Sequence, residues 1–315
     1  MAKENAESGG PELSWLKIDF ADALFSGGTG RSGTTIIGRL LSRHSQVTMS
    51  KPAEIKFLTS GNGILDLSAR RRVGRYKRLL VNDRLHLERF KYRLFHDWWE
   101  RESKTGDRAG LLQGISEEDL RKIYLNLKDR FDVDIPLATQ RFMREFIDSQ
   151  LRNAGKRMWI DTTPVNIFRA NEIAQLMPKC KFIHMVRDGR DVISSAIREK
   201  WGPTNYQDGL VWYRRRMVRN LVNGVSLKEQ MLTISLEDLV INKRKSTLQR
   251  VLSFLNLRSE RKLIEFFDSV VLESSINQGR WRDEVADIKS FNNSYADLLE
   301  EFKAIDSTVP LTFFS

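Results

Sequence analysis

A glycine-rich turn that also carries an arginine and two threonines has the residue types needed to bind an anion. It reads Gly27-Gly28-Thr29-Gly30-Arg31-Ser32-Gly33-Thr34-Thr35. Glycines let successive backbone N–H groups converge on one point, the hydroxyls add hydrogen-bond donors, and the arginine adds a permanent positive charge. Together these groups suit a phosphate-like ligand.

The turn lies between two short elements that would hold it in place. The apolar run Ala23-Leu24-Phe25 precedes it and predicts a buried strand, and Thr34 opens a segment whose apolar residues follow helical spacing. A helix N-terminus presents unpaired amides and the positive end of the helix dipole to an anion. The order of strand, glycine turn and helix therefore predicts a phosphate-binding loop.

The loop differs from a nucleoside triphosphate-binding loop at one position. Gly28 and Gly33 satisfy the G-x-x-x-x-G spacing, but the next residue is Thr34, where such loops have lysine. That lysine would reach the β- and γ-phosphates. The cation lies inside the turn instead, at Arg31. This difference disfavours hydrolysis of ATP or GTP and leaves a P-loop kinase or NTPase as an alternative function.

A second charged group follows another predicted strand, 181–186. It begins with Arg187-Asp188-Gly189-Arg190-Asp191 and continues into a helix that contains Ser195. An arginine at a strand end and a hydroxyl about two helical turns later can bind one phosphate together. The alternatives are a surface ion pair for Arg187, and a mutual pair or capping of the helix for Arg190 and Asp191. Because ligands of parallel sheets bind at the carboxyl ends of strands, we expect this group to lie beside the glycine turn.

The rest of the chain predicts a single α/β domain with a central parallel sheet flanked by helices. Further strands are predicted at 47–49, 158–160 and 231–235, and helices at about 165–177, 206–228 and 245–272. Residues 1–14 read as a flexible tail and 15–315 as the domain. Within it, residues 66–157 read as a mostly helical insertion that recognises the substrate.

The insertion combines an apolar face with a basic flank. The apolar residues are Leu79, Leu80, Leu85, Leu87, Phe90, Leu94, Phe95, Trp98 and Trp99. The basic residues are Arg70, Arg71, Arg72, Arg75, Lys77, Arg78, Arg84, Arg89, Lys91 and Arg93. This charge fits a solvated face of packed helices or the recognition of an anionic or amphiphilic acceptor. No signature of a nucleic-acid-binding module accompanies it, so no nucleic-acid partner is expected.

Composition narrows the class of protein. The 315 residues contain 52 Lys and Arg against 41 Asp and Glu, which gives a net charge of +11 and indicates an anionic partner. No apolar run is long enough for a membrane span, although peripheral contact with a membrane stays open. Cys180 is the only cysteine, so no internal disulfide and no cysteine-based metal cluster is expected. These features lead us to expect a cytoplasmic protein.

The two phosphate motifs together resemble those of the PAPS-dependent sulfotransferases, which take a sulfuryl group from 3′-phosphoadenosine 5′-phosphosulfate (PAPS). Residues Gly30 to Thr35 look like the family's 5′-phosphosulfate loop, and Arg187 with Ser195 looks like its 3′-phosphate site. The resemblance covers about residues 21–300. It implies a P-loop-like sulfotransferase fold, PAPS as co-substrate, no metal, and a small-molecule, lipid or glycan acceptor.

Three further segments are similar to the family. Asp161-Thr162-Thr163-Pro164 looks like its Lys-Thr-Pro segment, with Thr162 in the place of lysine, and Ser235-Leu236-Glu237-Asp238-Leu239 looks like its Tyr-Glu-Asp-Leu segment. Gly279-Arg280-Trp281-Arg282 resembles the Gly-x-Trp loop that closes over the nucleotide. This last likeness implies donor contacts for Arg280, Trp281 and Arg282, while a core role is the alternative for Trp281. Trp201-Gly202 fits either a contact near the adenine or the end of a helix.

The resemblance also implies a mechanism. A hydroxyl or amine of the acceptor attacks sulfur in line, Arg31 stabilises charge on the departing phosphate, and 3′,5′-adenosine bisphosphate is released. The tyrosylprotein and heparan types use a glutamate shortly after the first helix, and Glu54 lies there. The alternatives for the base are a histidine of the insertion, His86 or His96, or another residue. A non-catalytic nucleotide- or nucleic-acid-binding module is the remaining alternative function.

Overall fold

The computed structural model describes residues 18–69, 83–102, 106 and 108–311. The predicted tail at 1–14 therefore lies outside the described residues. So do six of the basic residues expected on the insertion and two of its apolar ones, which are Arg70, Arg71, Arg72, Arg75, Lys77, Arg78, Leu79 and Leu80.

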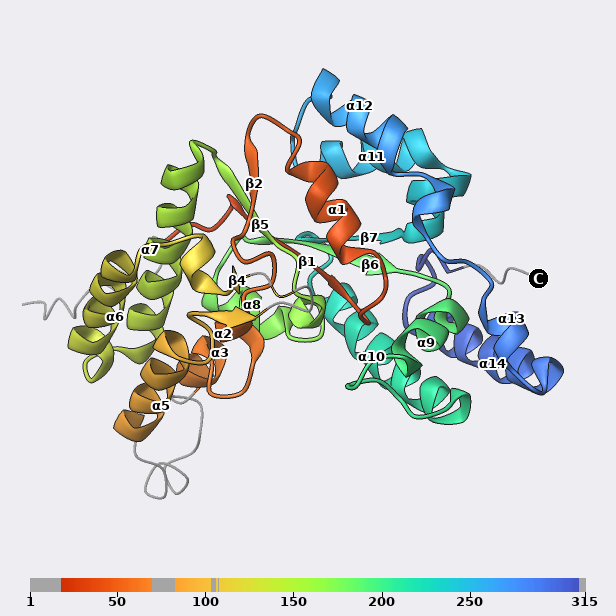
Figure 1. Ribbon diagram of the computed structural model, residues 1–315, viewed down its shortest axis with the longest axis horizontal. Coiled ribbons are helices and arrows are strands. Elements are labelled where there is room, and N and C mark those ends of the chain that lie inside the picture. The colour runs from red at the N-terminus through yellow and green to blue at the C-terminus, as the bar shows by residue number, and fades with distance from the viewer. Residues whose placement is uncertain (1–17, 70–82, 103–105, 107, 312–315) are drawn as a thin grey trace, which may run out of the picture.

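A five-stranded parallel sheet forms the centre of the molecule (Figure 1). Its strands, in spatial order, are β2 (Val47–Met49), β5 (Met158–Asp161), β1 (Ala23–Gly28), β6 (Lys181–Val186) and β7 (Met231–Ser235). The predicted α/β class with a parallel sheet is confirmed. Because all five strands run the same way, the residues that follow them gather at one edge of the sheet.

Strand β1 is longer than its apolar run. It continues through Gly27 and Gly28, which pair with His184 and Met185 of β6. At Gly27 a Cβ atom would lie 2.8 Å from the carbonyl oxygen of Pro164, so the absence of a side chain lets the next segment pack directly on the strand. The predicted glycine turn therefore begins two residues later than the apolar pattern indicates.

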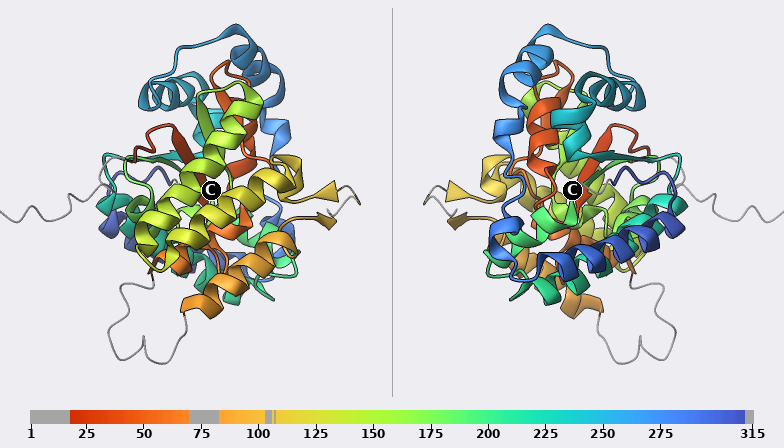
Figure 2. Two further views of the ribbon diagram at one scale, coloured as in Figure 1. Left: turned by 90° about the vertical axis from the view of Figure 1, so that its left-hand side faces the viewer. Right: turned by 90° about the vertical axis from the view of Figure 1, so that its right-hand side faces the viewer.

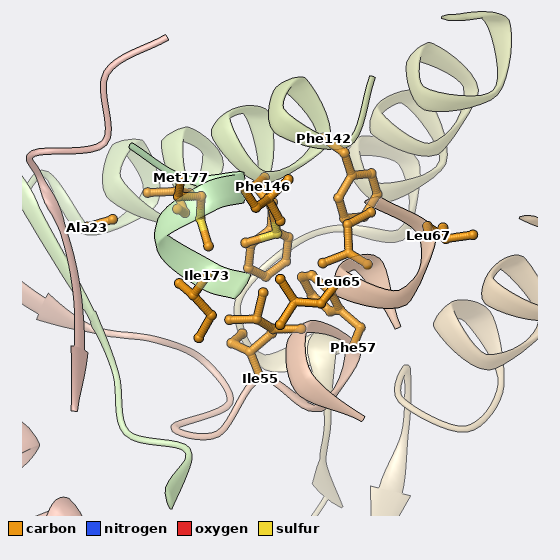
Figure 3. Close-up of a cluster of buried hydrophobic side chains, with 14 of the residues drawn as sticks. Ala23, Ile55, Phe57, Leu65, Leu67, Phe142, Phe146, Ile173 and Met177 are labelled. Atoms are coloured by element: carbon orange, nitrogen blue, oxygen red, sulfur yellow. The ribbon is translucent and has the colours of Figure 1, made fainter. Parts of the chain in front are cut away.

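Helices cover both faces of the sheet. On one face α1 (Thr34–Leu41), α11 (Arg244–Phe254) and α12 (Arg261–Val270) pack on side chains such as Leu24 and Ile183. On the other face α7 (Ile135–Ala154) and α8 (Ala170–Leu176) pack on Phe25 and Phe182. Figure 3 shows part of this second cluster, in which Phe57 packs against Phe142 and Phe146 of α7 and Ile173 of α8 lies on the side of Phe146.

The segment between β2 and β5 is mostly helical, as predicted. It contains α2 (Lys56–Thr59), α3 (Ile64–Ser68), α5 (Asp83–Phe95), the 3-10 turn η3 (Leu111–Gln113), α6 (Glu117–Phe131) and α7. Helices α6 and α7 run side by side (Figure 2). A small hairpin of β3 (Arg101–Glu102) and β4 (Arg108–Ala109) is an addition that the helical pattern did not indicate.

The predicted apolar face of the insertion is largely correct. Leu87, Phe90, Leu94 and Trp98 are buried in the core. Leu85 is the exception, because 47% of its surface is exposed on α5. Its expected place in the apolar face is wrong, since it lies on the side of the helix that faces away from Leu87 and Phe90.

The C-terminal part adds a third apolar cluster beside the sheet. It includes α9 (Gly189–Ile197), α10 (Tyr206–Ser226), α13 (Trp281–Glu284) and α14 (Ile288–Ile305). The π-helical segment η5 (Asp238–Asn242) follows β7, and the 3-10 turn η6 (Glu273–Ser275) precedes α13. No helix in the described part of the chain combines the length and apolar character needed to cross a bilayer.

The helix predicted at about 165–177 is instead two elements. The 3-10 turn η4 (Pro164–Asn166) comes first and α8 follows at Ala170. The break arises where the Asn166 amide turns into the sheet and donates to the Ser26 carbonyl at 3.1 Å. This side-chain bond competes with regular helical pairing at the same place.

Candidate active site

A cleft of about 650 Å³ opens where the strands end. Four of the five strands contribute residues that follow them: Thr29, Gly30, Arg31, Gly33, Thr34 and Thr35 after β1, Thr163, Pro164 and Val165 after β5, Arg187 after β6 and Leu236 after β7. The glycine turn and the second charged group therefore share one cleft, as the parallel-sheet argument predicts.

The glycine turn is bent so that its amides remain available. Gly30, Arg31 and Gly33 have φ angles of 88°, 58° and 90°, all in the left-handed region. Within the described residues, the backbone amides of residues 30–35 donate no hydrogen bond to the rest of the fold. No side chain caps the N-terminus of α1. These donors therefore fit an anion at the start of α1.

Arg31 points from the turn toward the second motif. Its Nε donates to the Oγ of Ser195 at 2.8 Å, and its Nη1 lies 3.6 Å from a carboxylate oxygen of Glu199. Ser195 lies in α9, which begins directly after the second charged group. The side chain of Arg31 remains 46% exposed, so its guanidinium is accessible from the cleft.

Arg187 lines the cleft from a nearly buried position. Only 8% of its surface is exposed. Its Nη1 donates to the Arg31 carbonyl at 3.1 Å, and its Nη2 donates to the carbonyl of Asn277. Its Nε is buried and has no hydrogen-bond partner within the described part of the chain. A buried donor of this kind is costly unless a ligand accepts from it, which fits an anion bound beside the turn.

Asp191 connects Arg187 with the segment after η6. Its carboxylate lies 3.8 Å from Arg187 and accepts a hydrogen bond from the Gly279 amide at 2.8 Å. Burial raises the pKa of Asp191 to about 6, although the charge of Arg187 acts in the opposite direction. The alternative in which Asp191 pairs with Arg190 does not hold. Arg190 is fully buried and pairs with Asp188 at 2.7 Å.

The carboxylate of Glu237 supports the backbone of the second charged group. One oxygen of Glu237 accepts from the Asp188 amide at 3.0 Å, and the other accepts from the Ser235 hydroxyl at 2.7 Å. Burial raises the pKa of Glu237, and these two hydrogen bonds oppose that shift. The Glu237 side chain therefore fixes the turn between β6 and α9 to the end of β7.

Glu54 also lines the cleft, next to Lys56. The Lys56 Nζ is 2.5 Å from its carboxylate, and 38% of the Glu54 side chain is exposed. Both backbone neighbours are fixed: the Ile55 amide donates to Asp161 at 2.8 Å, and the Ala53 carbonyl accepts from Thr162. The position of Glu54 is therefore set by the end of β5.

Asp161 organises this part of the cleft from a fully buried position. Besides the Ile55 amide, it accepts from the Thr163 amide at 2.9 Å and from the Asn166 Nδ2 at 2.6 Å. Burial raises the pKa of the carboxyl, and the hydrogen bonds from Asn166 and Thr163 lower it. Thr162, in the place of the family's lysine, is buried with its hydroxyl on the Ala53 carbonyl at 2.9 Å, so it cannot supply a cation.

Four of the residues predicted to bind the donor nucleotide do not line the cleft. Ser32 is buried, and its hydroxyl has no partner among the described residues. Trp281 is 2% exposed, and its ring carries the guanidinium of Arg190 at 4.3 Å. Arg280 and Arg282 are exposed beside it. The cleft wall in this region consists of Ser275, Ile276 and Asn277 instead. Donor contacts of these four residues stay a prediction.

The sequence reasoning missed several cleft residues, among them Glu199, Arg216 and Asn277. Glu199 follows Ser195 by four residues, about one helical turn, so spacing could have found it. Asn277 contributes a backbone carbonyl to Arg187, for which a sequence carries no signal. Trp201, for which a contact near the adenine or the end of a helix was expected, lines the cleft, and the contact with adenine stays a prediction. No cluster of three potential metal ligands occurs among the described residues.

Comparison with known proteins gives one family. The model of a family described as "Sulfotransferase family" matches residues 23–261, well over half of the chain. Sulfotransferase STF9 from Mycobacterium avium has a similar structure, with 13% identity, a TM-score of 0.51, and coverage of 94% of this chain and 79% of that one. The sulfotransferase domain of the Synechococcus PCC 7002 olefin synthase is 15% identical, with a TM-score of 0.45 and coverage of 89% and 93%. No curated protein sequence matches.

Proposed function

The chain belongs to the sulfotransferase family, and we propose that it transfers a sulfuryl group from PAPS to a hydroxyl or amine of an acceptor. The product from the donor is 3′,5′-adenosine bisphosphate. One observation carries this proposal: the carbonyl of Arg31 accepts from Arg187 at 3.1 Å, while its side chain donates to Ser195 at 2.8 Å. The two phosphate motifs thus form one continuous site.

The hydrogen-bond donors of this site fit a nucleotide with two separate anionic ends. The free amides of residues 30–35 at the start of α1 suit the 5′-phosphosulfate. Arg187, with its unpartnered Nε, and Ser195 suit the 3′-phosphate. A nucleoside triphosphate, whose phosphates form one chain, would leave one of these groups without a ligand. This asymmetry supports PAPS over ATP or GTP.

The residues around the cleft divide the chemical work. PAPS would supply an electrophilic sulfur. Glu54 accepts the proton of the attacking hydroxyl or amine, so that a new bond to sulfur forms as the bond to the 5′-phosphate oxygen breaks. Arg31 and the amides of the turn stabilise the negative charge on that leaving oxygen. Lys56, 2.5 Å from Glu54, holds the carboxylate in the cleft wall.

Calorimetry and a product assay test the proposal. We expect 3′,5′-adenosine bisphosphate to bind tightly without Mg²⁺ and ATP to bind weakly. Incubation with PAPS and native cell extract should yield an acceptor heavier by one SO₃ unit. Tight, Mg²⁺-dependent ATP binding would instead support a kinase or NTPase, and PAPS that stays intact with a broad acceptor panel would support a non-catalytic module.

A further inference from the structure

Arg216 is a cation of the cleft that the reaction described above does not use. It projects from α10 into the cleft and is partly buried. Two other arginines of the helix face carboxylates: Arg214 lies 2.5 Å from Glu301 and Arg219 lies 3.5 Å from Glu172. No described residue forms an ion pair with Arg216. Its guanidinium stacks on the ring of Trp212, 4.5 Å from the centroid.

The other cations that line the cleft each face a carboxylate. Lys56 pairs with Glu54 at 2.5 Å, Arg31 lies 3.6 Å from Glu199, and Arg187 lies 3.8 Å from Asp191. Among the described residues that line the cleft, Arg216 is therefore the cation without a carboxylate within 4 Å. Burial and the neighbouring charge of Arg215 both lower the pKa of Arg216, which means that its charged form lacks compensation.

Two tryptophans extend from Arg216 toward the glycine turn. The rings of Trp212 and Trp201 are 6.2 Å apart and inclined by 33°. Trp201 lines the cleft, and a Cβ atom on Gly30 would lie 3.5 Å from its ring. Half of the Trp201 surface, 51%, is nevertheless exposed. An exposed indole in a cleft offers a flat apolar surface on which a ring can stack.

We infer that Arg216, Trp212 and Trp201 form an acceptor subsite for a carboxylate or similar oxyanion carried by a flat, apolar molecule. The inference rests on the proposed function, in which the turn and Arg187 hold the donor and leave Arg216 for a second anion. The oxyanion binds the fork of the guanidinium. The flat body stacks on Trp201, and the acceptor hydroxyl lies in the same cleft as Glu54.

A pair of probe acceptors that differ only in charge tests the subsite. The probes are 3-(4-hydroxyphenyl)propionate and its uncharged amide. With the unaltered protein we expect kcat/KM for the carboxylate to exceed that for the amide by about tenfold, mainly through a lower KM. Arg216→Gln should bring the ratio close to one, and Arg216→Lys should retain part of it. Arg215→Gln, which removes the same charge from an exposed neighbour, should leave the ratio unchanged.

Two results would overturn the inference while the proposed function stands. One is equal use of both probes by the unaltered protein. The other is a loss of affinity for 3′,5′-adenosine bisphosphate in Arg216→Gln, because that would make Arg216 part of the donor site. Circular dichroism of each variant checks its fold, and Arg216→Lys provides the comparison if Arg216→Gln does not fold.

A binding measurement keeps the two proposals separate. Calorimetric titration of both probes, with and without 3′,5′-adenosine bisphosphate, needs no turnover. If no sulfuryl transfer occurs but the carboxylate probe binds about tenfold more tightly than the amide in an Arg216-dependent way, the subsite stands and the proposed function fails. Equal binding of both probes rejects the subsite, whatever the donor result.

Discussion

The Nε of Arg31 donates a hydrogen bond to the Oγ of Ser195, 2.8 Å away and 164 residues later in the sequence. The contact joins the glycine turn that follows β1 to helix α9 that follows β6. Arg31 reaches Ser195 from a left-handed backbone conformation, with φ 58°. The bend of the turn therefore directs its cation across the cleft, toward the second phosphate motif.

If this contact matters for catalysis, Arg31 and Ser195 should not act independently. We expect Arg31→Ala and Ser195→Ala each to lower kcat/KM, and the double variant to lower it by less than the product of the two effects. The coupling free energy should be about 1 kcal/mol, the usual value for such a hydrogen bond. Steady-state kinetics of the four proteins measure it. Ser253→Ala, on the exposed side of α11, should combine with Arg31→Ala additively.

Arg187→Ala should weaken the binding of 3′,5′-adenosine bisphosphate. The loss of a buried guanidinium that contacts a phosphate should cost about 1.5–3 kcal/mol, or roughly 10- to 150-fold in affinity. Calorimetry measures the change directly. Arg250→Ala removes the same charge from an exposed position on α11 and should leave affinity as it was. Unchanged affinity in Arg187→Ala would refute its assignment to the donor.

Glu54→Gln should reduce kcat at least about 100-fold, since the amide cannot accept the acceptor proton. Affinity for 3′,5′-adenosine bisphosphate should stay the same, because Glu54 is not among the residues proposed to bind the donor. Single-turnover kinetics and calorimetry separate the two effects. Glu88→Gln on α5, where the side chain is 55% exposed, is the matched control. If turnover survives in Glu54→Gln, the base is another residue.

Asp191 should make stability depend on pH. Its pKa is raised from 3.8 to about 6, so the folded state binds the proton more tightly than the unfolded chain and loses stability as pH rises through this window. Asp191→Asn keeps the acceptor for the Gly279 amide and removes the charge. We expect its free energy of unfolding to exceed that of the unaltered protein by about 1–3 kcal/mol near neutral pH and by much less near pH 4. Urea denaturation at both pH values measures this. An equal gain at both would contradict the assignment.

Gly33→Ala should disturb the turn, whereas Gly61→Ala should not. Gly33 has φ 90°, and a Cβ atom there would lie 2.6 Å from Leu236. The substitution should cost about 1–2 kcal/mol of stability and reduce donor affinity. Gly61 has no atom within 4 Å of such a Cβ, so its variant should match the unaltered protein. Thermal unfolding compares the two. Equal midpoints would mean that the left-handed bend is not required.

The strands and the glycine turn were predictable because their signals are local. Short apolar runs ended by glycine or charge mark β1, β5 and β6, and Thr34 marks the start of α1. The exact length of β1 was not predictable. Gly27 and Gly28 belong to the strand because β6 pairs with them, and that pairing depends on residues more than 150 positions away.

The site could be predicted only where side chains follow strand ends. Arg31, Arg187 and Glu54 meet in one cleft for this reason. Trp281 shows the limit, because a tryptophan after glycine fits both a closing loop and a core position, and packing against Phe291 and Arg190 decides between them. That Arg216 forms no ion pair with a described residue likewise depends on which carboxylates the fold brings to α10.

The amide of Asn166 bonds both the Ser26 carbonyl of β1 and the Asp161 carboxylate, which in turn holds the backbone beside Glu54. The strand that leads into the glycine turn and the segment that carries the proposed base are thus both held by the buried pair of Asn166 and Asp161. Arg216 and Trp212 belong to α10, and Trp201 belongs to the loop before it. None of the three takes part in these hydrogen bonds of Asn166 and Asp161. If Arg216 and the tryptophans bind the acceptor as proposed, substitutions there would change acceptor preference and leave the glycine turn and Glu54 in the same relative position.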